Sequence, residues 1–235
     1  MNMDKEDQVK KILLMPIIAS KDIKGITLAT RNDTNESFIL SGHSYGDTTD
    51  EDMSDIAICF YKEIYDIDIM NKEKYGDVDF AGDVMNSYKR IAGRITCSSD
   101  KKEKWKKMYH CLANFWILPM EVGRKGTKGF SKSQVSKDYM DGFLKVLSEK
   151  YAEYSERYKE YFAEFGEFTE FCEKHCIKNV YFKDNERVKI TGLKKADQVI
   201  NVMESMCIKR ANELWKAKGE ELYSLFEQCN LIQKS

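Results

Sequence analysis

Apolar and aromatic residues recur with helical spacing through the second half of this 235-residue chain. Between residues 136 and 175 the spacing alternates between four and three, which places these residues on one face of an α-helix. The positions on this face are Leu147, Tyr151, Tyr154, Tyr158, Tyr161, Phe165 and Phe168. Such a face packs against a core far more often than it binds a ligand. Gly166 is expected to divide the pattern into two helices.

The same spacing continues to the C-terminus, with a break expected near Gly219. Its apolar positions are Val199, Val202, Met203, Met206, Leu214, Leu222, Leu225 and Phe226. In the first half, a helix over residues 3–15 should end before Pro16, and another should begin after Ser54 as N-cap. The second of these should bury Ile56, Phe60 and Ile64. Helices are also predicted over residues 83–95 and 100–110, and a Gly-rich loop over residues 123–136.

Two segments show strand patterns instead. Residues 25–30 and 37–41 flank a polar turn, so they predict a β-hairpin. A weaker alternation around the turn 183–186 favours a second short hairpin near residues 179–190.

Composition agrees with a helical fold, because the chain has only 2 Pro and 13 Gly beside abundant Lys, Glu, Met and Leu. We therefore predict a predominantly α protein, with residues 1–235 forming a single compact helical domain and a small N-terminal β-hairpin. Its core should contain the aromatic face, one of Trp105 and Trp116, and Trp215.

No apolar stretch approaches the roughly 20 residues that span a bilayer, and no signal peptide is recognisable, so we expect a cytoplasmic protein without a membrane partner. The seven Cys are odd in number and scattered, which is typical of reduced thiols. Cys172, His175 and Cys176 are the only tight group. A zinc site needs about four ligands, so this group predicts two buried thiols and a surface His rather than a metal centre.

Charge is distributed unevenly along the chain. Residues 1–88 contain 9 Lys/Arg and 18 Asp/Glu, whereas residues 89–137 contain 13 and 3, and residues 138–235 contain 16 and 18. We call residues 89–137 the basic block. A block of this charge attracts anions, whether phosphates, an acidic partner or the acidic first third of the chain.

The loop at residues 124–132 is the best candidate for a binding surface within the basic block. Its Gly residues let backbone amides approach a phosphate, its cations supply charge, and its aromatic ring offers a surface for a base. Lysines at residues 101–107 would extend this surface. The candidate binding residues are Lys102, Lys106, Arg124, Lys125, Lys128, Phe130 and Lys132.

The segment from His110 through Asn114-Phe115 to Pro119 resembles the H-x-hydrophobic-G-N-hydrophobic segment in the HNH nuclease half of GmrSD-type restriction enzymes. It is more similar still to an uncharacterised group of bacterial and phage proteins with an N-F-x-x-x-P segment after a Gly-Asp-x-x-Asn-Ser element. Residues 82–87 have that element here. The second resemblance covers about residues 80–182.

The nuclease resemblance implies a general base and a divalent cation on the scissile phosphate. His110 would be the base, Asn114 its orienting partner and Asp83 a ligand for Mg or Mn. The resemblance also implies an Asp/Glu-His pair upstream, and this chain has none; Ala113 moreover replaces the family's Gly. Alternatively, His110 packs near a helix end and Asn114 makes backbone hydrogen bonds at a turn.

Two classes of function follow. The first is a non-catalytic intracellular binding protein of bacterial or phage origin, acting in phage–host conflict without a cofactor. It would contact nucleic acid or a nucleic-acid-processing protein through the basic block. The second is a metal-dependent nuclease with a degenerate HNH-like site, and the missing Asp/Glu-His pair favours the first.

Overall fold

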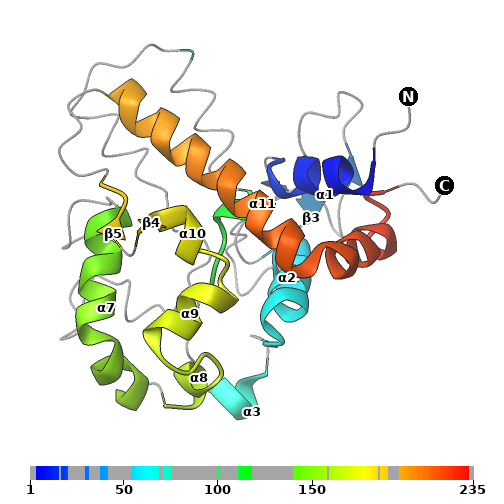
Figure 1. The fold of residues 1–235 in the computed structure, drawn as a ribbon. Helices are drawn as coiled ribbons and strands as arrows, with labels where there is room; N and C mark the ends of the chain where they lie inside the picture. Colours follow the sequence, from blue (N-terminus) through cyan, green and yellow to red (C-terminus); the bar gives the residue numbers. More distant parts are fainter. Residues whose placement is uncertain are drawn as a thin grey trace.

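Helices make up most of the computed structural model, which confirms the predominantly α fold class (Figure 1). The structure describes residues 4–15, 17–20, 30–31, 38–41, 54–68, 71–75, 100, 111–117, 140–157, 159–184, 186–189 and 196–232. The described helices are α1 (Lys5–Leu13), α2 (Asp55–Tyr65), α3 (Lys72–Tyr75), the 3-10 helix η2 (Leu112–Asn114), α7 (Met140–Arg157), α8 (Lys159–Ala163), α9 (Phe168–Lys174), α10 (Lys178–Tyr181) and α11 (Ala196–Gln228). The described strands are β1 (Ile17–Ser20), β2 (Thr30–Arg31), β3 (Phe38–Ser41), β4 (Phe182–Lys183) and β5 (Glu186–Arg187).

The long helix α11 crosses the molecule and contacts α1, α2, α10 and η2 (Figure 1). Its backbone leaves helical geometry at Lys218 (φ -144°, ψ 33°), next to Gly219, so the predicted break is confirmed. Val199, Met203 and Leu214 are buried, which confirms the apolar face assigned to this helix. Trp116 is fully buried as well, whereas Trp215 is half-buried against the core.

Local signals account for the N-terminal helices. The Asp4 carboxylate accepts a hydrogen bond from the Asp7 backbone N–H at 2.8 Å and so caps α1. Ser54 precedes α2 with the extended backbone of an N-cap, although no cap hydrogen bond from its side chain is present. The three side chains predicted for burial in α2 are buried, namely Ile56, Phe60 and Ile64.

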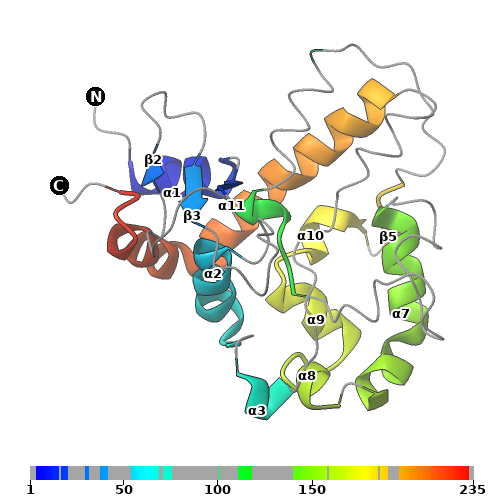
Figure 2. The ribbon, with the colours of Figure 1, turned by 180° about the vertical axis from the view of Figure 1, so that it is seen from behind.

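A three-stranded sheet with order β1-β3-β2 packs beside α2 (Figure 2). β2 pairs antiparallel with β3, which confirms the N-terminal hairpin, although residues 25–29 of the predicted first strand lie outside the described part. β1 pairs parallel with β3, with Ile17 opposite Phe38, and the sequence did not predict this strand. A parallel partner joins through a crossover and not through a turn, so no local turn signal announces it.

The second hairpin is also present, because β4 and β5 pair antiparallel with Lys183 opposite Glu186. Asp184 in its turn has a φ of 53°, a left-handed conformation that Asp tolerates better than most residues do.

Gly166 divides the aromatic face as expected, and its φ of 70° is in the region that favours glycine. Leu147, Tyr151, Tyr154 and Phe165 are buried, so most of this face is core. The side chains of residues 158 and 161 lie outside the described part. The predicted elements at residues 83–95, 101–110 and 123–136 lie outside it too.

Replacing Gly166 with alanine should lower the free energy of unfolding by about 2 kcal/mol, because an L-residue at positive φ costs about 1–2 kcal/mol. A Cβ here would also lie 1.6 Å from Glu170 Oε2. That oxygen accepts the Glu167 backbone N–H at 3.0 Å in the capping box of α9, so the cap would be displaced. Urea unfolding measures the change.

Glu170→Ala separates the two causes, because it removes the cap but not the backbone strain. In that background Gly166→Ala should still cost about 1 kcal/mol. A cost of zero would show that the backbone at residue 166 is unstrained.

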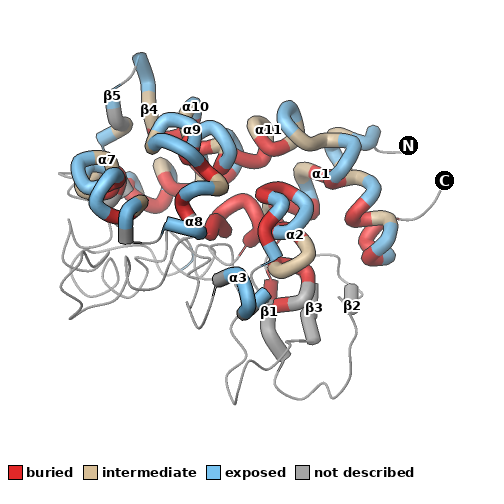
Figure 3. The backbone as a smooth tube through the Cα atoms, turned by 90° about the horizontal axis from the view of Figure 1, so that it is seen from below, coloured by how far each residue is buried: buried red, intermediate tan, exposed pale blue. Residues whose placement is uncertain are grey.

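Buried side chains of the described residues form one hydrophobic core, and Figure 3 marks the positions of the buried residues along the backbone. Buried segments line the inner faces of α1, α2, α9 and α11. Among the described helices, none combines the length and the apolar character required to cross a bilayer.

Candidate functional site

A guanidinium group lies at the centre of the core. Arg210, near the middle of α11, has an exposed fraction of 0%. Its Nε donates to the His175 carbonyl oxygen at 3.0 Å. Its Nη1 donates to the carbonyl oxygens of Ala113 at 3.0 Å and Phe115 at 2.6 Å. Its Nη2 donates to the Tyr65 hydroxyl at 2.7 Å.

These acceptors come from three separate parts of the chain, so Arg210 joins them to α11. The planar guanidinium presents five N–H groups in a fixed arrangement, which a lysine cannot reproduce. Among the described residues, no carboxylate forms an ion pair with Arg210. Burial raises the pKa of Tyr65, and the positive charge of Arg210 opposes that rise in part.

Residues 111–117 receive two of these hydrogen bonds, and we call them the anchored segment. None of them is more than 1% exposed. Cys111 precedes the single turn η2, and the Asn114 backbone N–H donates to the Cys111 carbonyl oxygen at 2.8 Å. The chain then becomes extended at Phe115 (φ -94°, ψ 131°). The anchored segment is the apolar middle of the otherwise cationic basic block.

His175 lies beside Arg210 and is completely buried. Its ring centroid lies 4.0 Å from that of Phe171, 4.5 Å from Tyr65 and 4.7 Å from Phe165. Nδ1 is 2.9 Å from the Phe171 carbonyl oxygen and Nε2 is 3.2 Å from the Ile117 carbonyl oxygen. The expected surface His is therefore wrong: the ring fills a space between aromatic side chains and α9.

Burial is the main reason why the pKa of His175 falls to about 3, and the nearby positive charge of Arg210 lowers it further. The ring is consequently neutral at physiological pH. The neutral ring donates to one of these two carbonyl oxygens only, and because its other nitrogen also faces backbone inside the core, neither nitrogen is exposed to a substrate or a metal.

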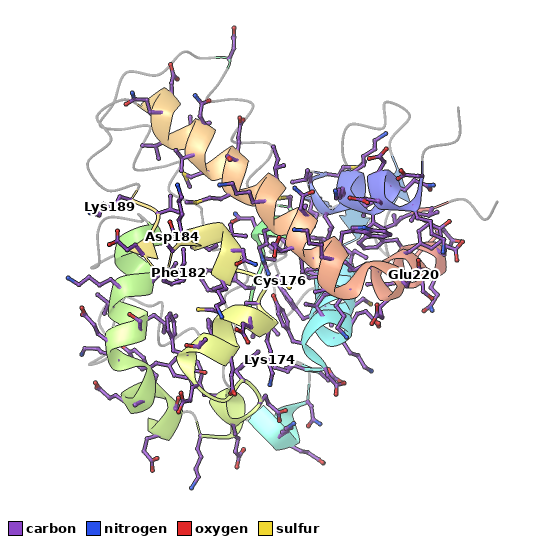
Figure 4. All side chains as sticks on the ribbon, viewed as in Figure 1. Lys174, Cys176, Phe182, Asp184, Lys189 and Glu220 are labelled. Carbon is purple, nitrogen blue, oxygen red and sulfur yellow. The ribbon has the colours of Figure 1, made fainter. Side chains whose placement is uncertain are left out.

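Cys172 and Cys176 line a surface pocket of about 370 Å³ together with Asn179 and Glu213. Figure 4 shows Cys176 near α11, just beyond the end of α9. Burial raises the pKa of Cys172 to about 12 and also raises that of Cys176, so both remain thiols. Within the described residues, no three His, Cys, Asp or Glu side chains are arranged to hold a metal ion.

Of the residues proposed from sequence for chemistry or binding, the structure describes Asn114, which has an exposed fraction of 0%. It ends η2 at a turn before an extended segment, in the position that the non-catalytic interpretation assigns to it. The others lie outside the described residues, namely Asp83, Lys102, Lys106, His110, Arg124, Lys125, Lys128, Phe130 and Lys132.

Sequence reasoning missed Arg210, although a signal for it exists. The apolar positions at Val199, Met203, Met206 and Leu214 leave residue 210 on the same helix face. A charged residue inside such a face predicts a buried, hydrogen-bonded group.

Comparisons of the chain with protein-family models, with curated proteins and with solved structures found no match. The residues of the chain itself therefore provide the basis for assigning a function.

Proposed function

We propose that this protein binds nucleic acid without cleaving it, through the basic block, and that it acts in phage–host conflict. The observation that carries the proposal is the charge of this block, 13 Lys/Arg against 3 Asp/Glu in 49 residues. Neutralising phosphates with Lys and Arg releases condensed counterions, and this release supplies most of the affinity of non-specific binding.

Ion pairs elsewhere support assigning the excess charge to the basic block. Several lysines on the described helices form ion pairs, such as Lys5 with Glu220 at 2.8 Å and Lys216 with Glu213 at 2.7 Å. Pairs of this kind add little stability, but they cancel charge locally. Figure 4 shows Glu220 on the C-terminal part of α11. The described helices therefore carry little net positive potential.

The anchored segment connects the two cationic runs in the sequence. Residues 101–107 end four residues before Cys111, and residues 124–132 begin seven residues after Ile117. A chain extends at most roughly 3.5 Å per residue. The first run therefore ends within about 14 Å of Cys111, and the second run begins within about 25 Å of Ile117. Because Arg210 holds this segment in the core, the chain leads into both runs from one buried segment.

The burial of Asn114 restricts the role that it could have in a nuclease. A residue that orients a catalytic base must lie within hydrogen-bond reach of groups that meet the substrate. Asn114 has an exposed fraction of 0%, and the carbonyl groups on both sides of it accept from Arg210. Asn114 itself therefore cannot contact a substrate, and a catalytic role for it would be limited to orienting His110 from inside the core.

Fluorescence anisotropy with a labelled DNA duplex, a DNA single strand and an RNA strand, measured across a salt series, tests the proposal. The double variant Lys125→Glu/Lys128→Glu should bind at least tenfold more weakly at about 0.1 M salt, and its salt slope should fall by about 2. The control Lys145→Glu/Lys150→Glu makes the same change of charge on α7 and should leave affinity within about twofold.

Three outcomes would contradict the proposal. Equal weakening by both double variants would show that only net charge matters. Cleavage with Mg or Mn that His110→Ala and Asn114→Ala abolish would establish the nuclease instead. Absence of binding to all three probes, together with stable co-purification of a nucleic-acid enzyme, would assign the basic block to a protein partner.

A further inference from the structure

Two cysteines from distant parts of the chain meet in the core. Cys111 begins the anchored segment and Cys207 lies on α11, and both are buried free thiols. Their side chains form a hydrogen bond with each other. This bond from the Cys207 thiol lowers the pKa of Cys111, and the backbone N–H of Asn114 adds to the effect, against that of burial. The two sulfur atoms therefore face each other.

Arg210 holds this arrangement from one turn further along α11. Residues 207 and 210 are three positions apart and so lie on the same helix face. Nη1 of Arg210 donates to the carbonyl oxygen of Ala113 at 3.0 Å, two residues after Cys111. A disulfide requires two side chains that point toward each other from backbones that are already close. The packing of η2 on α11 and the contact between the two thiols fit this requirement.

Burial decides when a bond between these sulfurs can form. In the folded protein Cys111 and Cys207 are enclosed by the core, so an oxidant in the solvent does not reach them. Both thiols are accessible in the unfolded chain, and folding brings them together before the core closes around them. Once the bond has formed, the same burial protects it from thiol reductants, because exchange requires direct attack on a sulfur.

We propose that Cys111 and Cys207 are a disulfide-forming pair that closes as the chain folds in the presence of a small-molecule disulfide such as oxidised glutathione. In a reducing compartment the pair would remain as the two thiols of the structure. The proposal does not depend on the basic block, so it and the nucleic-acid proposal succeed or fail independently.

The reaction is two thiol–disulfide exchanges. The thiolate of one cysteine attacks a sulfur of oxidised glutathione, the S–S bond of glutathione breaks, and a glutathione thiolate leaves. The thiolate of the other cysteine then attacks the cysteine sulfur of this mixed disulfide, and the second glutathione thiolate leaves. The two cysteines lose two electrons, which reduce the oxidised glutathione, and their two protons end on the two glutathione thiols.

Refolding of the reduced full-length chain from urea in a mixture of reduced and oxidised glutathione tests the proposal. Free thiols are then alkylated with iodoacetamide, and the peptides are mapped by mass spectrometry without reduction. Most chains should be lighter by about 2 Da before alkylation, the mass of two hydrogens. They should yield one peptide that links Cys111 to Cys207, with the other five of the seven cysteines alkylated. The same mixture added to the folded protein should give at least tenfold less of this peptide in the same time.

Stability provides a second measurement. A bond between residues 111 and 207 closes a loop of about 95 residues, and cross-links around long loops restrict the unfolded chain most. Its urea midpoint should therefore rise by about 1 M relative to the same protein refolded without glutathione. Cys207→Ala should show no rise between its own two preparations, whereas Cys59→Ala, on α2, should keep both the rise and the linked peptide.

The proposal is overturned if Cys111 and Cys207 are both alkylated after refolding, or if another pairing predominates. Cys59 with Cys229, whose charges influence each other, and Cys172 with Cys176, which line one pocket, are the competing pairs. Equal yields from folded and unfolded protein would show that burial does not control the reaction. The peptide map of the parent chain gives the answer even if Cys207→Ala fails to fold.

Discussion

Arg210→Met is expected to lower the free energy of unfolding by about 3–5 kcal/mol, because four buried acceptors lose their donor at about 1–3 kcal/mol each while the apolar side chain that replaces the buried charge offsets part of this loss. Methionine fills much of the same volume but donates no hydrogen bond. The carbonyl oxygens of Ala113, Phe115 and His175 and the hydroxyl of Tyr65 would then lie in the core without their donor. Urea unfolding followed by circular dichroism measures the change, and the thermal midpoint should fall by about 10 °C.

Two further variants make this result specific. Arg210→Lys keeps the charge but cannot reach acceptors in three directions, so it should also be destabilised. Lys209→Met changes the exposed neighbouring residue and should stay within about 0.5 kcal/mol of the parent protein. If Arg210→Met were as stable as the parent, the anchored segment would be held by apolar packing alone.

Acidification from pH 7.5 to 5 is expected to remove about 2 kcal/mol of stability through His175 alone. Its folded-state pKa is about 3 against an ordinary value of 6.5, so the unfolded chain binds the proton first. The stability that the neutral His175 ring contributes is therefore fully present above pH 6.5. It is lost as the pH falls from 6.5 toward 3. Urea unfolding at half-unit intervals between pH 7.5 and 5 measures it, in a range where carboxylates contribute little.

His175→Phe should remove this pH dependence, because phenylalanine occupies the same aromatic environment without a titrating group. The chain contains two other His, and His43→Gln and His110→Gln provide controls that should leave the His175 contribution intact. The opposite sign, with greater stability at pH 5, would mean that the carbonyls of Phe171 and Ile117 hold the ring in its doubly protonated form.

The elements predicted correctly are those with local causes. Pro16 ends the first helix, Ser54 precedes the second, and Gly166 and Gly219 mark the breaks in the C-terminal half. Each signal acts within a few residues through backbone geometry or side-chain spacing, so it can be read without knowing what lies across the core.

Features that depend on contacts between distant segments were missed or predicted wrongly. β1 needs β3 as a parallel partner, about twenty residues away in the sequence. His175 was expected at the surface beside two thiols, but residues from α2, the anchored segment and α9 enclose it. The environment of a polar side chain is set by all the elements that surround it, and helical spacing reports only one of them.

By itself, the sequence determined the helical content, the two hairpins and the concentration of cations in residues 89–137. These follow from local conformational preference and from composition, which do not depend on how the chain packs. Only the tertiary structure decided that Arg210 holds the anchored segment and that Asn114 and His175 lie in the core. Burial and hydrogen-bond pairing are properties of assembled elements, because residues as far apart as Tyr65 and Arg210 become neighbours only when the core forms.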